Sequence, residues 1–248
     1  MKEVKLPLKN KNIIITRAKD QVSEVKRMFQ QEGAIIYDLP ALIIDYPKDI
    51  KPLDNALEGI NDFHWVIFSS ANGIKFVEKR LSLKGTSLKE FSNKLKIAVV
   101  GDKTSQYLNK IGLKADYIPP KFIGDSLVEN FPVPLQGLRL LIPRVESGGR
   151  RTIIDDFITA GAIVTAVAAY ESKCPSVIPQ KTINAFQNKI IDAILFSSGK
   201  TVKNTSKLLK MHFGEEWKSM LSDIKFLTIG PQTTLACQKE FGRVDKQA

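Results

Sequence analysis

The sequence predicts an α/β protein made of two similar lobes, each a parallel sheet flanked by helices. Two observations predict this fold class. Short motifs recur about half a chain apart, which indicates a duplication. Continuous apolar runs alternate with amphipathic runs, which is typical of parallel sheets covered on both faces. The 248 residues are 43% hydrophobic and 25% charged, a mixture that can bury a large core and that excludes a disordered chain.

The duplication rests on four pairs of motifs whose offset stays between 127 and 129 residues. The pairs are 13–17 with 140–144, Gly33 with Gly161, 68–70 with 196–198, and 100–104 with 229–233. A period of this length indicates duplicated domains, because solenoid repeats run to only about 20–50 residues.

The first copy opens with a strand, a helix and a second strand. Residues 12–16 form a continuous β-branched run, which predicts a buried strand. Residues 19–32 carry apolar side chains at helical spacing, and Gly33 stands where a helix-capping glycine belongs. Residues 34–38 are then expected to form the second strand.

The rest of the pattern repeats this alternation. Residues 65–68 and 97–100 are apolar runs that predict buried strands, and helices are expected to begin at 69–72 and at Asp102. In the second copy, strands are expected near 138–142, 162–167, 191–196 and 225–229.

Two proline-containing stretches in the middle of the copies, 35–46 and 164–178, could connect spatial domains. In that case the chain crosses from one lobe to the other and back. The sequence repeats then need not coincide with the lobes.

Composition narrows the function. The net charge of +11 suits nucleic acid, an anionic surface or a strongly anionic small molecule. The two cysteines, Cys174 and Cys237, fit a reducing compartment. No apolar run approaches membrane-spanning length, and the run after the basic N-terminus is too short for a signal peptide.

The repeated motifs lie at the carboxyl ends of predicted strands, where parallel α/β sheets bind ligands. Backbone N–H groups and the helix dipole at such positions favour anions. The candidate residues are Ser69, Ser70, Asn72, Thr104, Ser197, Ser198, Gly199, Lys200, Gly230 and Thr233. Taken singly, each Ser or Thr could instead be an ordinary N-cap. Four such helix starts on one chain favour a binding cleft.

Two arginines, Arg17 and Arg144, follow strands at equivalent places and are candidate carboxylate clamps or surface salt-bridge partners. The glycine-containing stretch 146–151 adds Arg150 as an anion contact, but it lacks the ending of a nucleotide-binding loop.

Common catalytic groups are missing. His64 and His212 are isolated and are expected to be structural, and no metal-ligand spacing or dinucleotide fingerprint is present. Tyr170 is a candidate proton donor, with aromatic packing between lobes as the alternative.

In order along nearly the whole chain, these motifs resemble the uroporphyrinogen-III synthase family. The likeness is carried by Thr16-Arg17, Phe68-Ser69-Ser70, Val100-Gly101 with Thr104, Tyr170, 196–199, and Ile229-Gly230-Pro231 with Thr233. The resemblance implies a cleft between two lobes joined by two extended connectors. One lobe would hold residues 1–38 and 173–248, and the other 39–172.

The resemblance also implies an activity. The substrate would be hydroxymethylbilane, a linear tetrapyrrole with eight carboxylates. A cyclising hydro-lyase would close it to uroporphyrinogen III with inversion of ring D and loss of water, through an azafulvenium cation and a spiro intermediate. Tyr170 would assist loss of the hydroxyl. No cofactor or metal is implied.

Substrate contacts implied by the resemblance come from helix starts and basic residues. They are Thr16, Arg17, Ser69, Ser70, Asn72, Thr104, Arg144, Arg150, Ser197, Ser198, Gly199, Lys200, Lys225, Gly230 and Thr233. We expect a cytoplasmic monomer in transient contact with the preceding enzyme of the pathway, without nucleic acid or membrane.

Two departures from the family pattern stand out. Gln232 occupies a position where the family often has Thr, so the binding role is expected at Thr233. Family members usually continue after the equivalent of Gly242 with another strand and helix, so either the chain is shortened or the first lobe lacks a closing element.

Two other functions are compatible with parts of the sequence. A two-lobed binding protein for an anionic small molecule would share the duplication and the cleft. Nucleic-acid binding would use the positive charge, but the basic residues are scattered and no recognition motif accompanies them.

Overall fold

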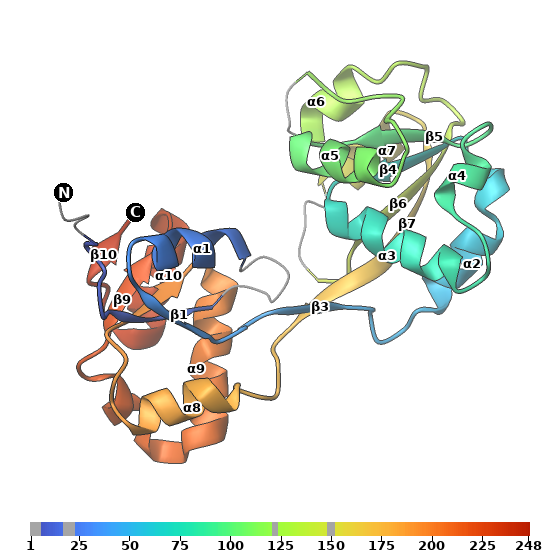
Figure 1. Cartoon of the computed structure of the whole chain (residues 1–248). Coiled ribbons are helices and arrows are strands. Elements are labelled where there is room, and N and C mark those ends of the chain that lie inside the picture. Colours follow the sequence, from blue (N-terminus) through green and yellow to red (C-terminus); the bar gives the residue numbers. More distant parts are fainter. Residues whose placement is uncertain (1–5, 17–22, 121–123, 148–151) are drawn as a thin grey trace, which may run out of the picture. The chain divides into compact units, whose positions relative to one another are not determined.

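The computed structural model describes residues 6–16, 23–120, 124–147 and 152–248. It confirms an α/β protein with two mainly parallel sheets flanked by helices (Figure 1). The chain divides into two compact units, one formed by Met1–Ile44 with Lys173–Ala248 and the other by Asp45–Ser172.

The sheet of the first unit has five strands in the order β10-β9-β8-β1-β2. The strands are β1 (Asn12–Ile15), β2 (Ile35–Asp38), β8 (Ala193–Phe196), β9 (Lys225–Thr228) and β10 (Lys246–Gln247). All neighbouring strands run parallel. The two-residue β10 closes the edge beyond β9, although the sequence pattern does not predict a strand after Gly242.

Alternation along these strands sends side chains to two separate cores. Ile14 packs with Phe196 and Phe226 on one face, whereas Ile13 and Ile15 belong to a smaller cluster on the other. Because successive strand residues point to opposite faces, a continuous apolar run is what a sheet covered on both sides requires.

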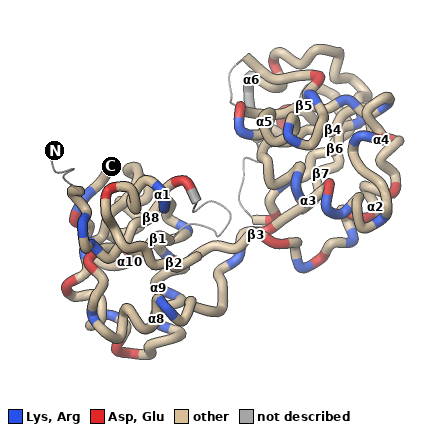
Figure 2. Tube along the Cα trace, viewed as in Figure 1, with Lys and Arg blue, Asp and Glu red and all other residues tan. Residues whose placement is uncertain are grey.

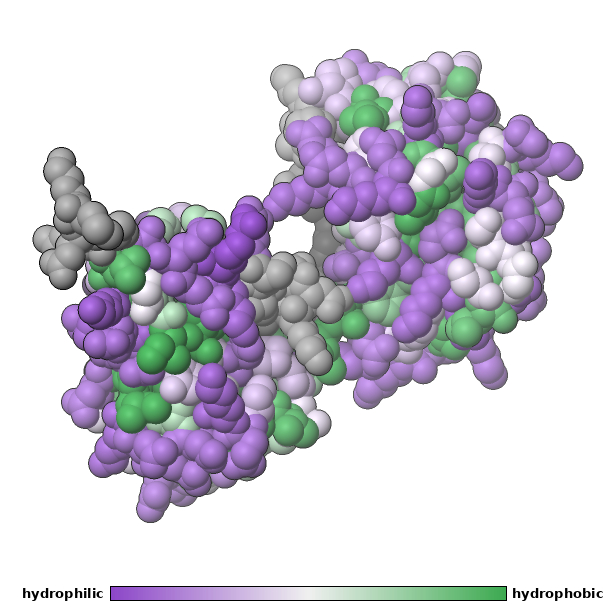
Figure 3. Space-filling view, in the orientation of Figure 1, coloured by the Kyte–Doolittle hydropathy of each residue, from purple (hydrophilic) through white to green (hydrophobic). Residues whose placement is uncertain are grey.

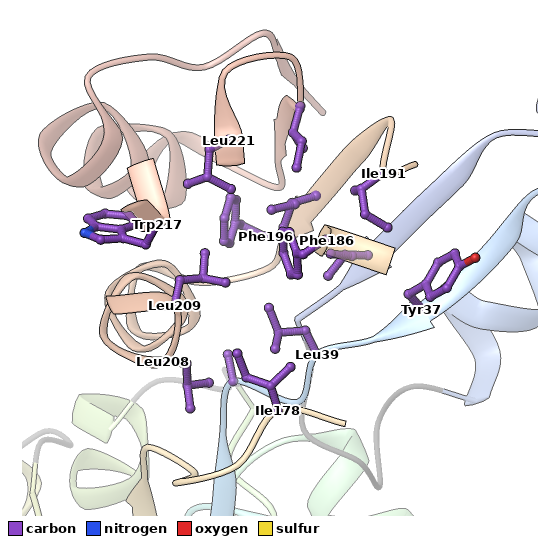
Figure 4. Close-up of a cluster of buried hydrophobic side chains, with 14 of the residues drawn as sticks. Tyr37, Leu39, Ile178, Phe186, Ile191, Phe196, Leu208, Leu209, Trp217 and Leu221 are labelled. Carbon is purple, nitrogen blue, oxygen red and sulfur yellow. The ribbon is translucent and has the colours of Figure 1, made fainter. Parts of the chain in front are cut away.

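The larger core of this unit lies under four helical segments: α8 (Gln180–Gln187), α9 (Gly199–Phe213), η3 (Gly214–Leu221) and α10 (Pro231–Phe241). Figure 4 shows Leu208 and Leu209 of α9, Trp217 of η3 and Phe186 of α8 around Phe196. The smaller cluster takes Val25 and Phe29 from α1 (Ser23–Gln31).

The sheet of the second unit has the order β3-β7-β6-β4-β5. The strands are β3 (Ile43–Asp45), β4 (Trp65–Phe68), β5 (Lys96–Val99), β6 (Arg139–Val145) and β7 (Ile163–Lys173). The pairs β4–β5, β4–β6 and β6–β7 are parallel. The proline-flanked stretches 35–46 and 164–178 therefore consist largely of strand.

Helices cover both faces of this second sheet as well. Val66, Phe68 and Val99 pack under α2 (Lys51–Glu58), α3 (Ala71–Ser82), α4 (Leu88–Phe91) and α5 (Asp102–Lys110). Trp65 and Ile67 face α6 (Gly124–Glu129) and α7 (Thr152–Thr159). A short 3-10 helix, η2 (Ile60–Asp62), precedes β4.

The sequence repeat and the compact units do not coincide. The repeat offset maps β1 and β2 onto β6 and β7, and β4 and β5 onto β8 and β9. The order β9-β8-β1-β2 in one sheet thus corresponds to β5-β4-β6-β7 in the other. Each unit combines half of the first copy with half of the second, because the chain passes between the units twice.

The surface is polar and its charges are spread out. Lys and Arg occur on both units and alternate with Asp and Glu (Figure 2). The face in Figure 3 is mostly hydrophilic, with small separate apolar areas. In the part of the chain that the structure describes, no helix has the length and apolarity needed to cross a membrane.

Candidate active site

In the second unit, Ser70 and Tyr170 meet at the carboxyl edge of the sheet. Ser70 follows β4 and is the N-cap of α3, where its Oγ accepts a hydrogen bond from Gly73 N–H at 3.2 Å. The same Oγ lies 2.8 Å from the phenol oxygen of Tyr170, which comes from β7. Both side chains are half-buried. One hundred residues of sequence separate this pair.

The ring of Tyr170 is fixed by its neighbours. It stacks on Phe76 of α3, with ring centroids 5.9 Å apart and planes inclined by 28°. Tyr46 packs edge-on against Phe76, with ring centroids 5.0 Å apart. The backbone is held where β6 and β7 change register, because Glu146 N–H donates to Tyr170 O at 2.8 Å.

The neighbouring helix start at β5–α5 is built differently. Gly101, with φ of 93°, takes a backbone conformation that side chains disfavour and begins α5. Thr104 is only 4% exposed, and its hydroxyl donates to Val100 O at 3.1 Å. Thr104 therefore stabilises the turn, and an anion contact at this helix start would use backbone N–H groups.

The three arginines expected to bind carboxylates differ in placement. Arg144 lies at the end of β6, is half-buried, and donates through Nε to Val145 O at 3.2 Å. Arg17 and Arg150 lie outside the described residues. Ser69 is exposed beside Ser70, and Asn72 is half-buried in the first turn of α3.

In the first unit, Ser198 caps α9 in the way that Ser70 caps α3. Its Oγ accepts from Thr201 N–H at 3.3 Å. Ser197 beside it is half-buried, and Lys200 is exposed. A Cβ on Gly199 would come within 3.0 Å of Ala236 Cβ, so this glycine allows α9 and α10 to approach.

The last helix start, at Gly230, joins α10 to the end of the chain. Gly230 has φ of 78°, and its N–H donates to Ala248 O at 2.9 Å. Thr233 is 4% exposed in the first turn. The adjacent Thr234, which the sequence analysis does not single out, bonds to Thr228 at 2.7 Å and to Gln247 at 2.6 Å.

Two predicted contacts differ from the others in burial or in position along the strand. Thr16 is fully buried, and its hydroxyl donates to Leu195 O at 2.9 Å, so it joins β1 to β8. Lys225 is the first residue of β9 and lies at the amino edge of the sheet. Lys225 therefore does not lie with the helix starts at Ser70, Gly101, Ser198 and Gly230, because each of these follows the carboxyl end of a strand.

Other titratable candidates have structural roles. His64 Nδ1 accepts from Arg139 N–H at 3.0 Å, and His212 packs edge-on against Phe213. Burial raises the pKa of the Cys237 thiol to about 12, with a further contribution from Asp245. Such a thiol is unreactive near neutral pH.

A cavity of about 370 Å³ lies away from the strand-end loops, lined in part by Trp217, Phe226 and Arg243. The Arg243 guanidinium donates to three backbone carbonyls, those of Leu221, Ser222 and Ile224. This arginine therefore ties η3 to the end of α10. Within the described ranges, no group of three or more His, Cys, Asp or Glu side chains could hold a metal ion.

Solved structures place the chain in a class of two-unit α/β folds. A mutant uroporphyrinogen III synthase from Thermus thermophilus matches 96% of this chain and 92% of its own, with a TM-score of 0.57 and 13% identity. The uroporphyrinogen-III synthetase from Helicobacter pylori gives the same coverage and TM-score at 17% identity. These likenesses establish the fold.

Sequence comparison identifies the family. The family described as uroporphyrinogen-III synthase HemD matches residues 23–248. A uroporphyrinogen-III synthase from Synechococcus elongatus is 44% identical over 242 residues, which cover 98% of this chain and 91% of that protein. The chain belongs to the uroporphyrinogen-III synthase family, whose members are hydro-lyases of tetrapyrrole biosynthesis.

Proposed function

We propose that this protein closes hydroxymethylbilane to uroporphyrinogen III, with inversion of ring D and loss of water. Family membership supports the activity. The observation that carries the assignment to residues is the Ser70–Tyr170 pair, because it holds a phenol at the carboxyl edge of a parallel sheet.

Tyr170 acts as the general acid in this proposal. Its phenol proton passes to the hydroxyl on the ring A side, the C–O bond breaks, and water leaves behind an azafulvenium cation. Ring D attacks through its substituted carbon and gives a spiro intermediate. That intermediate fragments and closes again in the inverted orientation, and a proton is lost to restore the pyrrole.

The remaining task of the protein is to favour one folded conformer of a flexible substrate, which is proximity and orientation catalysis. The helix starts at Ser70, Gly101, Ser198 and Gly230 offer backbone N–H groups and partial positive charge to the substrate carboxylates. Arg144 adds a guanidinium at the end of β6.

Further contacts are assigned by the family pattern and by position on the strand-end loops. Arg17, Arg150, Ser69, Asn72, Ser197, Gly199, Lys200 and Thr233 complete the proposed substrate contacts. The net charge of +11 would draw an octa-anionic substrate toward the protein.

We also propose a cytoplasmic monomer that receives its substrate during transient contact with the preceding enzyme of the pathway and binds neither nucleic acid nor membrane. The two free cysteines support a reducing compartment. Light scattering after size-exclusion chromatography tests the monomer, which must give a mass near 27.7 kDa. A mass near twice that value contradicts it.

Product analysis tests the proposed reaction. Protein and hydroxymethylbilane are incubated, the products are oxidised, and the isomers are separated by chromatography. We expect isomer III in the presence of protein and isomer I in its absence. Isomer I alone in both samples would contradict the assignment and favour a binding protein for an anionic small molecule.

A further inference from the structure

We infer that Ser70 is a positioning residue for Tyr170, and that it holds the phenol for proton transfer through a hydrogen bond anchored on the first turn of α3. This inference rests on the proposed function. It gives Ser70 a role beyond substrate contact, because its hydroxyl acts through the tyrosine.

Ser70 can accept a hydrogen bond from Gly73 and donate one to Tyr170 at the same time. A serine hydroxyl has one proton to donate and two lone pairs to accept. One lone pair of Ser70 accepts from Gly73 N–H, and the phenol oxygen of Tyr170 lies 2.8 Å away. When Ser70 donates, a chain runs from Gly73 N–H through Ser70 to the phenol oxygen. The phenol proton then remains free for the substrate.

The same chain of hydrogen bonds also stabilises Tyr170 after proton transfer. Loss of the phenol proton leaves a phenolate, which accepts a hydrogen bond more strongly than a phenol does. Ser70 faces that oxygen with its own proton, and its Oγ is polarised by a backbone N–H at the positive end of a 12-residue helix. Ser70 therefore stabilises the state that forms during the reaction.

Helix α3 holds Tyr170 at two points. Ser70 at its N-cap contacts the phenol oxygen, and Phe76 in its second turn stacks on the ring. Phe76 is 4% exposed and cannot move without disturbing the core. A Cβ on Gly73 would lie 3.3 Å from Pro143 O, so this glycine lets α3 sit close to β6, the neighbour of β7.

The duplication supplies an internal comparison. The repeat offset relates Ser70 to Ser198, and it relates Tyr170 to Leu42. Ser198 caps its helix through Thr201 N–H and has no phenol partner among the described residues. The two serines share the capping role, and only Ser70 bonds to a tyrosine. Ser198→Ala is therefore a matched control for loss of a cap.

A double-mutant cycle tests the inference. We measure kcat and KM for uroporphyrinogen III formation by Ser70→Ala, Tyr170→Phe and the double variant, and by Ser198→Ala alone and with Tyr170→Phe. Ser70→Ala should lower kcat about tenfold with less than a twofold change in KM. In the Tyr170→Phe background the same change should lower kcat less than twofold, because the hydroxyl that Ser70 positions is absent.

Ser198→Ala should have the same effect on kcat and KM in both backgrounds. Ser70→Thr should recover most of the kcat lost in Ser70→Ala, since it restores a hydroxyl. Ser70→Gly provides a second removal of the hydroxyl that disturbs the cap less, because glycine is tolerated at N-caps. It should match Ser70→Ala in kcat, and it carries the test if Ser70→Ala does not fold.

Equal fold-losses of kcat for Ser70→Ala, or for Ser70→Gly, with and without Tyr170 would overturn the inference. So would a change confined to KM, which would make Ser70 a substrate contact only. Failure of the wild-type protein to form isomer III would instead overturn the proposed function. The two failures are distinguishable because the cycle is read only when the wild-type protein turns over.

Discussion

At the scale of single residues, the hydroxyl groups on the strand-end loops fall into two kinds. Those of Thr16 and Thr104 are buried and donate to backbone carbonyls. Those of Ser70 and Ser198 cap helices and remain partly exposed. All four positions are candidates by sequence, because each hydroxyl residue follows an apolar run that predicts a strand. The sequence does not show which of these hydroxyls become buried. The hydrogen bond between Ser70 and Tyr170 supports the role proposed for these two residues.

Replacement of Tyr170 by Phe tests the proposed acid. Tyr170→Phe keeps the ring stacked on Phe76 and removes only the hydroxyl, so kcat should fall about 100-fold while KM changes less than threefold. Steady-state kinetics of isomer III formation measure both quantities. Tyr117→Phe is the control, since that phenol oxygen is buried without a hydrogen-bond partner among the described residues and lies in another cluster. Unchanged kcat in Tyr170→Phe would assign the residue to packing.

At the scale of elements, continuous apolar runs predict the central strands well. The runs predict β1 (Asn12–Ile15), β4 (Trp65–Phe68) and β8 (Ala193–Phe196), because a parallel sheet covered on both faces needs apolar side chains pointing to either face. The short edge strand β10 lacks that signal. β10 has two exposed polar residues and is held by backbone hydrogen bonds to β9.

The contact between Ser70 and Tyr170 could not be predicted from the sequence. The helix starts are predicted by local motifs, but the Ser70–Tyr170 contact joins residues on β4–α3 and β7 through the register of the sheet. The sequence shows Phe76 only as an apolar residue at helical spacing, and it does not predict that the ring stacks on Tyr170. Lys225 is a contact only by the family resemblance, because the expected strand 225–229 and the observed β9 both place it at the amino end of the strand.

The close packing of α9 and α10 gives a prediction about stability. Gly199→Ala would bring two Cβ atoms within 3.0 Å at Ala236, so it should lower the free energy of unfolding by about 2 kcal/mol. The double variant Gly199→Ala with Ala236→Gly should recover at least half of this loss, because it restores the space. Urea unfolding measures both. A loss that the second change does not relieve would refute the packing role of Gly199.

The ion pair between α2 and α3 predicts a pH dependence. Hydrogen bonds from Arg80 to Asp54, at 2.5 and 2.6 Å, hold the pKa of this carboxyl below its ordinary value of 3.8. The folded state thus favours the carboxylate. The pair contributes stability above pH 3.8 and loses it as pH falls through the lowered pKa.

Comparison of Asp54→Asn with the wild type measures this contribution. The variant should be less stable by about 1 kcal/mol at pH 6, and the difference should shrink below pH 4. Glu58→Gln is the matched control, because its partner Lys84 forms an exposed pair and the stability should change little. A difference for Asp54→Asn that is constant from pH 6 to pH 3 would contradict this account.

At the scale of the whole molecule, the duplication and the folding units are interleaved. The first sheet takes two strands from the first sequence copy and three from the second, and the second sheet takes three from the first copy and two from the second. A single copy therefore contains no complete core. The residues 45–172 form an uninterrupted unit with both of its cores, whereas the first copy divides its strands between two sheets.

Fragments test this organisation. A fragment of residues 45–172 should unfold cooperatively in urea with a circular dichroism spectrum typical of an α/β protein. A fragment of residues 1–127, which contains one full sequence copy, should lack a cooperative transition. Cooperative unfolding of the second fragment with none in the first would show that the repeat, and not the compact unit, is the folding unit.

The central claim is that this protein directs ring closure with inversion. The most direct measurement is the initial rate of uroporphyrinogen III formation from hydroxymethylbilane as the concentration of protein is varied, with isomers I and III resolved at each point. The rate of isomer III formation should rise in proportion to the protein while isomer I falls. A fraction of isomer III that does not depend on protein concentration would contradict the claim.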